Sequence, residues 1–174
     1  MIEAAAAWQT QSPRARRPSG RGRAIFNAFA IALLAACGDS TPVPAVPIES
    51  TTFAPALGVD LAASRKTPSG LYVRDISEGS GATLASGQTV EMRYVGSFAD
   101  GKVFDSNPAP KPPFSFRLGG GQVIKGWDEG LVGMKVGGRR QLVIPSALAY
   151  GPNDYGPIPG NSVLVFTVEA LGAR

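Results

Sequence analysis

After residue 67, only one stretch of the chain has the apolar spacing of a helix, and this limits the fold more than any other feature. The apolar residues of 123–134 follow one another at intervals of three, four and three, which places them on one helical face. They are Ile124, Trp127, Leu131 and Met134. A single short helix must bury that face against another layer. The chain is therefore expected to have an α+β fold.

The other layer is predicted to be an antiparallel sheet. Strand-like apolar patterns occupy residues 71–76, 89–96, 114–118, 139–144 and 162–171. In the second of these, Val90, Met92 and Tyr94 alternate with polar residues and share one face. Asp100-Gly101 is a hairpin signal. Residues 119–121 are three glycines without the Lys-Ser/Thr of a phosphate loop, so they are interpreted as a turn.

Several kinds of chemistry are excluded by composition. The chain has no histidine, so it cannot form a Ser-His-Asp triad, a Cys-His pair or an imidazole metal site. Cys37 is the only cysteine, which excludes an intrachain disulfide. Residues 1–36 hold five arginines and one glutamate, so the remainder has twelve basic and twelve acidic side chains. A neutral body gives no reason to expect nucleic-acid binding. No cofactor and no metal are expected.

The basic N-terminal segment has the pattern of a bacterial signal peptide. An apolar run over residues 24–36 follows Arg21 and Arg23, and it ends in Leu34-Ala35-Ala36-Cys37. This ending resembles a lipobox, in which the cysteine is lipidated and becomes the new N-terminus. The alternative is an ordinary cleavage site with an incidental cysteine. Since Gly38 follows Cys37, the resemblance favours the outer membrane, facing the periplasm; a soluble periplasmic protein is the alternative.

The chain is thus divided into three parts. Residues 1–36 are a lipoprotein-type signal peptide, residues 37–66 a tether rich in Pro, Thr and Ala, and residues 67–174 the folded domain. Prolines favour extended chain and remove backbone donors, so the tether is expected to add nothing to the core. A chain starting near Ala62 is therefore expected to fold alone.

The folded domain resembles the FKBP-type peptidyl-prolyl cis–trans isomerases from about residue 70 to 171. The resemblance is carried, in order, by Val90-Glu91-Met92-Arg93-Tyr94-Val95-Gly96, Asp100-Gly101-Lys102-Val103-Phe104-Asp105-Ser106, Pro113-Phe114-Ser115-Phe116, Leu118-Gly119, Val123-Ile124-Lys125-Gly126-Trp127, Ala149-Tyr150-Gly151 and Leu164-Val165-Phe166. It implies a twisted antiparallel sheet wrapped around one short helix, with a prolyl ligand bound between them.

The resemblance also implies an aromatic pocket with assigned roles. Trp127 would lie under the proline ring, with Tyr94, Phe104 and Phe166 as walls. The Ile124 N–H and the Tyr150 hydroxyl would hold substrate carbonyls, and Asp105 would form a polar edge. Phe114, Val123 and Ile158 would complete substrate binding. Phe116 is assigned to the core, and Tyr155 either contacts the residue before proline or caps its loop.

The function implied is peptidyl-prolyl cis–trans isomerisation in proteins that fold outside the cytoplasm. X-Pro segments of unfolded chains would be the substrates, and macrolides such as tacrolimus and rapamycin would compete with them. The alternative is a module that binds prolyl peptides or a partner at the membrane with little catalysis. Turnover of an X-Pro peptide separates the two.

Cys37→Ser is expected to release the protein from the membrane, because the variant lacks the sulfur that would carry the lipid. Fractionation of cells that express the parent and the variant measures this. If the variant stays with the membrane as the parent does, Cys37 is not the anchor.

Overall fold

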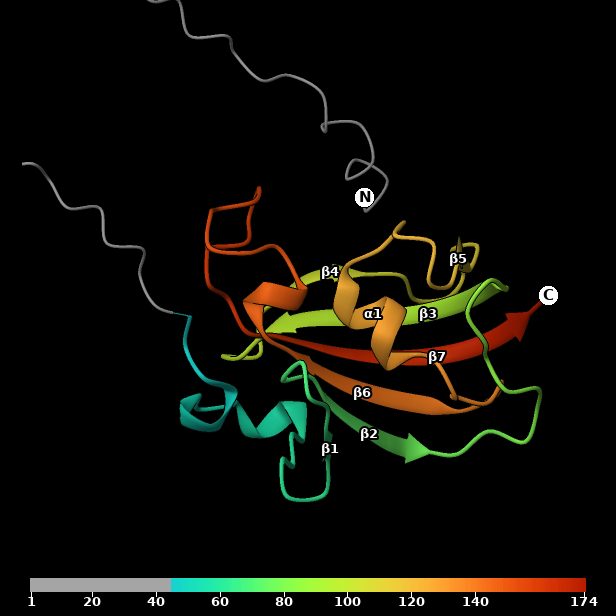
Figure 1. Ribbon diagram of the computed structural model, residues 1–174, viewed down its shortest axis with the longest axis horizontal. Coiled ribbons are helices and arrows are strands. Elements are labelled where there is room, and N and C mark those ends of the chain that lie inside the picture. The colour runs from blue at the N-terminus through green and yellow to red at the C-terminus, as the bar shows by residue number, and fades with distance from the viewer. Residues whose placement is uncertain (1–44) are drawn as a thin grey trace, which may run out of the picture.

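The computed structural model describes residues 45–174, which form one antiparallel sheet around a short helix (Figure 1). The strands are β1 (Arg65–Lys66), β2 (Tyr72–Ser77), β3 (Thr89–Phe98), β4 (Val103–Ser106), β5 (Phe114–Arg117), β6 (Arg139–Ile144) and β7 (Leu164–Ala173). Their order is β1-β2-β6-β7-β3-β4, and β5 also pairs with β3. Cys37 and the predicted signal peptide, residues 1–36, lie outside the described residues.

Strand β3 organises the part of the sheet that matters for the site. One side of β3 pairs along its length with β7, from Val90 to Phe98. Its other side pairs first with β5, as in Met92↔Phe114, and then with β4, as in Val95↔Ser106. The connection between β4 and β5, residues 107–113, therefore leaves the sheet at the middle of this edge.

The helix α1 (Lys125–Gly130) is shorter than the predicted 123–134. Ile124 is extended, with ψ of 147°, and Gly133 has φ of +79°, so neither end continues the helical backbone. The predicted apolar face is nevertheless buried, because Trp127, Leu131 and Met134 are at most 1 % exposed. The turn after the helix keeps these residues on the core side.

The strands agree with the alternation seen in the sequence. Val90, Met92 and Tyr94 all face the core and are at most 5 % exposed. β1 and β4 are additional strands that the apolar pattern does not indicate, and β4 follows the predicted hairpin at Asp100-Gly101. The glycine turn is confirmed, since Gly119 and Gly121 have positive φ.

A second apolar cluster covers the other face of the sheet. Val143 and Val165 point away from the helix, because neighbouring residues in a strand alternate between the two faces. They are covered by residues 48–61, which we call the strap; it contains the 3₁₀ turns η2 (Ile48–Ser50) and η3 (Pro55–Leu57). Ile48 is only 3 % exposed within this cluster. A further 3₁₀ turn, η4 (Ser146–Leu148), follows β6.

Hydrogen bonds fix the strap to the sheet. Gln141 Nε2 donates to the carbonyl of Leu57 at 2.8 Å, and the N–H of Ala54 donates to the carbonyl of Ala99 at 2.8 Å. Glu49 accepts hydrogen bonds from Lys66 and from the Tyr72 hydroxyl, and these lower the pKa of Glu49 to about 2.

This packing differs from the expectation that residues 37–66 form a free tether that adds nothing to the core. The described part, residues 45–66, contributes apolar side chains to the second cluster despite its prolines. Composition alone hides this, because a few apolar residues placed opposite Val143 and Val165 are enough. A chain that begins at Ala62 would leave that face of the sheet uncovered. Within residues 45–174, no helix is long and apolar enough to cross a membrane.

Ile48→Ala is expected to lower the free energy of unfolding by ~2–4 kcal/mol, because it removes a buried side chain and leaves a cavity over the sheet. Denaturant unfolding of the variant measures the loss. Val46→Ala is the control, since Val46 is 48 % exposed and its truncation should change the stability by about 0.5 kcal/mol or less. Equal stability of both variants would mean that the strap adds nothing to the fold.

Candidate functional site

The candidate site is a cavity of about 830 Å³ at the edge of the sheet where β4 and β5 meet β3. Six of the predicted site residues line it: Tyr94, Phe104, Asp105, Phe114, Tyr150 and Ile158. They come from β3, β4, β5 and the loop between η4 and β7, so four separate segments converge here. Ile158 is 4 % exposed and closes one side.

Trp127 lies beneath the cavity and does not line it. Its ring meets Tyr94 edge-on at 5.1 Å between centroids, Phe166 at 5.3 Å and Phe114 at 6.2 Å. Such edge-to-face pairs are the favoured aromatic arrangement. With Trp127 and Phe166 each 1 % exposed, the predicted wall Phe166 is also part of this buried layer. The cavity therefore has a layer of aromatic rings below it.

Val123 and Ile124 lie at the start of α1, half-buried against the core, and their side chains do not line the cavity. The prediction for Ile124 concerns its backbone N–H. Because α1 begins after Ile124, that N–H belongs to the set that a helix leaves without an internal acceptor. It has no hydrogen-bond acceptor among residues 45–174.

The polar side of the cavity is a hydrogen-bonded pair. The Tyr94 hydroxyl donates to Asp105 Oδ2 at 2.8 Å. Burial, and then the bond to this carboxylate, raise the pKa of Tyr94 well above its usual range. Tyr94 is therefore protonated at any physiological pH and keeps Asp105 in place at the cavity wall.

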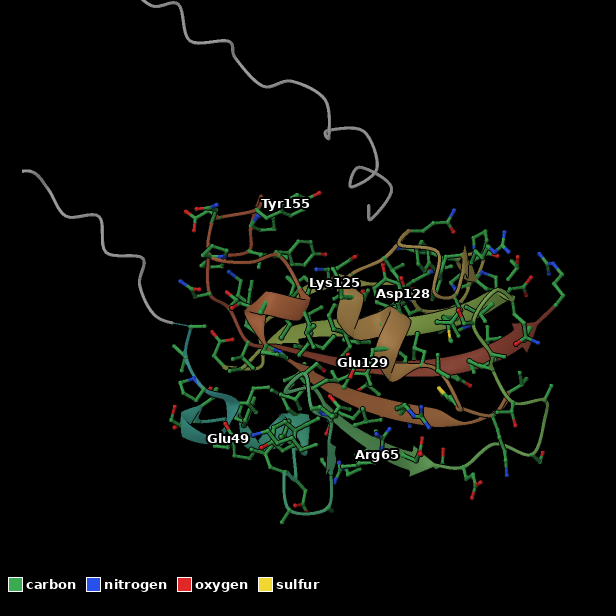
Figure 2. All side chains as sticks on the ribbon, in the orientation of Figure 1. Glu49, Arg65, Lys125, Asp128, Glu129 and Tyr155 are labelled. Atoms are coloured by element: carbon green, nitrogen blue, oxygen red, sulfur yellow. The ribbon has the colours of Figure 1, made fainter. Side chains whose placement is uncertain are left out.

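Tyr150 offers a second hydroxyl, and this one is free within the described chain. Burial raises the pKa of Tyr150 to about 12, so it is a donor at neutral pH. The hydroxyl has no hydrogen-bond partner among residues 45–174. Its ring stacks on Tyr155, with 4.7 Å between centroids and 20° between planes. Figure 2 shows Tyr155 on the loop between η4 and β7, where its side chain, 44 % exposed, forms part of the cavity rim.

Close packing at Gly96 was not predicted from the sequence. A Cβ on Gly96 would lie 2.6 Å from the Phe166 ring and 2.9 Å from the Phe104 ring. Only glycine lets these two rings meet over the strand, at 5.5 Å between centroids. The signal in the sequence is a glycine inside a strand, which often marks a close approach.

The rim also contains residues outside the ten pocket residues that the resemblance implies. Asn107, Lys111, Pro112 and Pro113 lie in the connection between β4 and β5 and border the cavity. Lys111 is the only cation among the lining residues. Phe116 faces the core and is 4 % exposed, as predicted. No group of acidic or cysteine side chains within residues 45–174 is arranged to hold a metal ion.

A family model of FKBP-type peptidyl-prolyl cis-trans isomerases matches residues 81–171. The chain belongs to this family. The match runs from before β3 through the loop between η4 and β7 to most of β7, and this stretch supplies all the residues of the cavity and its aromatic base.

Similar proteins occur in fungi and in bacteria. The "FK506-binding protein 4" of Rhizopus delemar is 54 % identical over 110 residues, which are 63 % of this chain and 28 % of that protein. The "FK506-binding protein 4" of Gibberella zeae is 48 % identical over 72 % of this chain and 26 % of its own length. The chain thus spans about a quarter of these two relatives.

Two solved structures agree with the fold. AtFKBP13 superposes with a TM-score of 0.60 and 41 % identity over 64 % of this chain and 98 % of its own. FkpA from Escherichia coli gives a TM-score of 0.60 and 42 % identity over 64 % of this chain and 52 % of its own. The α+β fold of a sheet around one short helix is confirmed.

Phe104→Ala is expected to lower kcat/KM for an X-Pro peptide about 10- to 100-fold, because it removes ~1.5–3 kcal/mol of apolar contact with the bound segment. The ring is only half-buried, so the variant should remain folded at the assay temperature. Peptide turnover and melting temperature are measured together. Val103→Ala is the matched control, since the neighbouring Val103 is 51 % exposed and does not line the cavity. A Phe104 variant that melts and turns over like the parent would place catalysis elsewhere.

Proposed function

We propose that this domain catalyses cis–trans rotation about X-Pro bonds in polypeptides. The observation that carries the proposal is a cavity with a buried aromatic base and a lining donor, the Tyr150 hydroxyl, that has no acceptor within residues 45–174. A second donor without an acceptor in that range, the Ile124 N–H, lies at the start of α1 beside Trp127 of the aromatic base. An apolar cavity suits a proline ring, and the donors suit the carbonyl groups beside it.

The reaction needs no bond to be broken. Rotation about the peptide bond faces a barrier of ~18–20 kcal/mol, because the twisted amide loses its resonance. A site lowers this barrier if it binds the twisted amide better than either planar form. The planar amide is the more polar of the two, so transfer from water to aromatic surroundings costs it more than the twisted form.

Each side chain then has a positional role. The proline ring lies over the aromatic base, between Tyr94 and Phe104, and is held there while the preceding carbonyl turns. The Tyr150 hydroxyl and the Ile124 N–H fix carbonyl groups of the substrate, so that one side of the bond is stationary. Asp105, held by Tyr94, presents a carboxylate edge to the rotating group.

Tyr150→Phe tests this assignment, because it removes the free donor and keeps the ring that stacks on Tyr155. Loss of one hydrogen bond to the substrate is expected to lower kcat/KM about 3- to 15-fold. Isomerisation of a short X-Pro peptide by the parent and the variant is the measurement, and tacrolimus should inhibit the parent competitively. Tyr155→Phe is the control, since it removes a hydroxyl from the rim and keeps the stack. A parent that binds the peptide without accelerating the rotation would be a binding module.

We further propose that the domain works on the periplasmic side of a bacterial membrane, attached through lipid on Cys37, with residues 1–36 removed. The support is the apolar run over residues 24–36 and its ending in Leu34-Ala35-Ala36-Cys37. The residues between Cys37 and the strap would connect the anchor to the domain. Unfolded secreted chains with X-Pro bonds are then the substrates, and the outer membrane is favoured over the inner one by Gly38.

A further inference from the structure

A second hollow in the described surface borders the candidate site. It is an open groove of about 520 Å³ between three segments: the chain at Val46 and Thr51, the turn between β3 and β4, and the loop before β7. Pro157 lines both this groove and the aromatic cavity, so the two hollows meet at one loop.

The walls of the groove are mainly apolar. Val46, Phe98, Pro159 and Val163 contribute to its surface, and Val46 is 48 % exposed. Charged groups are few, and the carboxylate of Asp100 already accepts the N–H of Lys102 at 2.9 Å. Such a surface fits a segment of unfolded polypeptide that carries apolar side chains.

One wall of the groove is formed by residues that the family model does not cover. Val46 and Thr51 lie before residues 81–171. They flank Ile48, which is buried against the sheet, so their positions are held by the fold. The strap also reaches the other wall, because the N–H of Ala54 donates to the carbonyl of Ala99. Val46 and the strap that follows it therefore supply one wall of the groove, and the strap supports a second one.

We propose that this groove binds a flanking part of the same polypeptide whose X-Pro bond lies in the aromatic cavity. The inference rests on the proposed function and specifies its substrate: unfolded chains with an apolar residue a few positions from the proline, rather than short prolyl peptides. Contact between the two hollows at Pro157 favours one continuous ligand over an unrelated partner. Binding energy from this remote contact holds the reacting bond in place.

Three fluorescent peptides with the same X-Pro bond test the proposal: a tetrapeptide, and two peptides of about twelve residues extended with apolar residues on the amino or on the carboxyl side. One extended peptide is expected to show a three- to tenfold higher kcat/KM than the tetrapeptide, since partial burial of a single apolar side chain in an open groove has about this effect. Rotation is followed by NMR exchange, and affinity by fluorescence anisotropy.

Val46→Asp places a carboxylate on the apolar wall, and Val132→Asp is the matched control on the loop after α1, where Val132 is 44 % exposed and lines neither hollow. In the full chain, Val46→Asp should lower kcat/KM for the extended peptide to that for the tetrapeptide and leave tetrapeptide turnover unchanged. Val132→Asp should keep the parent's kcat/KM for the extended peptide and for the tetrapeptide.

Other outcomes overturn the inference. Equal kcat/KM and equal affinity for all three peptides with the parent would mean that the groove holds no substrate. A Val46→Asp variant that binds the extended peptide more tightly than the parent would mean that the chain's own residues upstream of Ala45 fill the groove. If the parent binds the extended peptide more tightly than the tetrapeptide but accelerates the rotation of neither, the groove is a binding site for polypeptide and the proposed catalysis is wrong.

Discussion

The burial of Trp127 is the contact on which the rest of the site depends. Its ring can reach the aromatic layer only because α1 lies very close to β6. A Cβ on Gly126 would be 2.5 Å from the Ile144 side chain, and one on Gly130 would be 2.7 Å from Leu142. Two glycines in a helix of six residues cost backbone entropy, and they are tolerated because the packing of Trp127 against the sheet offsets that cost.

Above this layer, the sheet decides where the polar groups lie. The β3–β4 pairing places Asp105 opposite Gly96, where its carboxylate can accept the Tyr94 hydroxyl. Gly96 at the same point makes room for the rings of Phe104 and Phe166. The β3–β4 pairing at Gly96 and Asp105 thus fixes both an apolar wall and a polar edge of the cavity.

The two faces of the sheet are connected through the strap. On the outer face, the strap buries Ile48 and holds the β3–β4 turn at Ala99. That turn leads into β4, and the ring of Phe98 before it packs on Phe104 at 5.0 Å between centroids. The β3–β4 hairpin therefore connects the strap on the outer face of the sheet with Phe104 in the wall of the cavity.

The sequence by itself determined the fold class, most strands, the buried face of residues 123–134 and the aromatic set, because periodicity and motif order are local properties of the chain. Six of the ten pocket residues expected from the resemblance line the cavity, and Trp127 and Phe166 lie directly beneath it. Only the tertiary structure decided the early end of α1, the packing of the strap, the close approach at Gly96 and the rim formed by residues 107–113. Each of these arises from contacts between segments far apart in the chain, and a proline-rich composition or a lone glycine does not specify which surface it will meet.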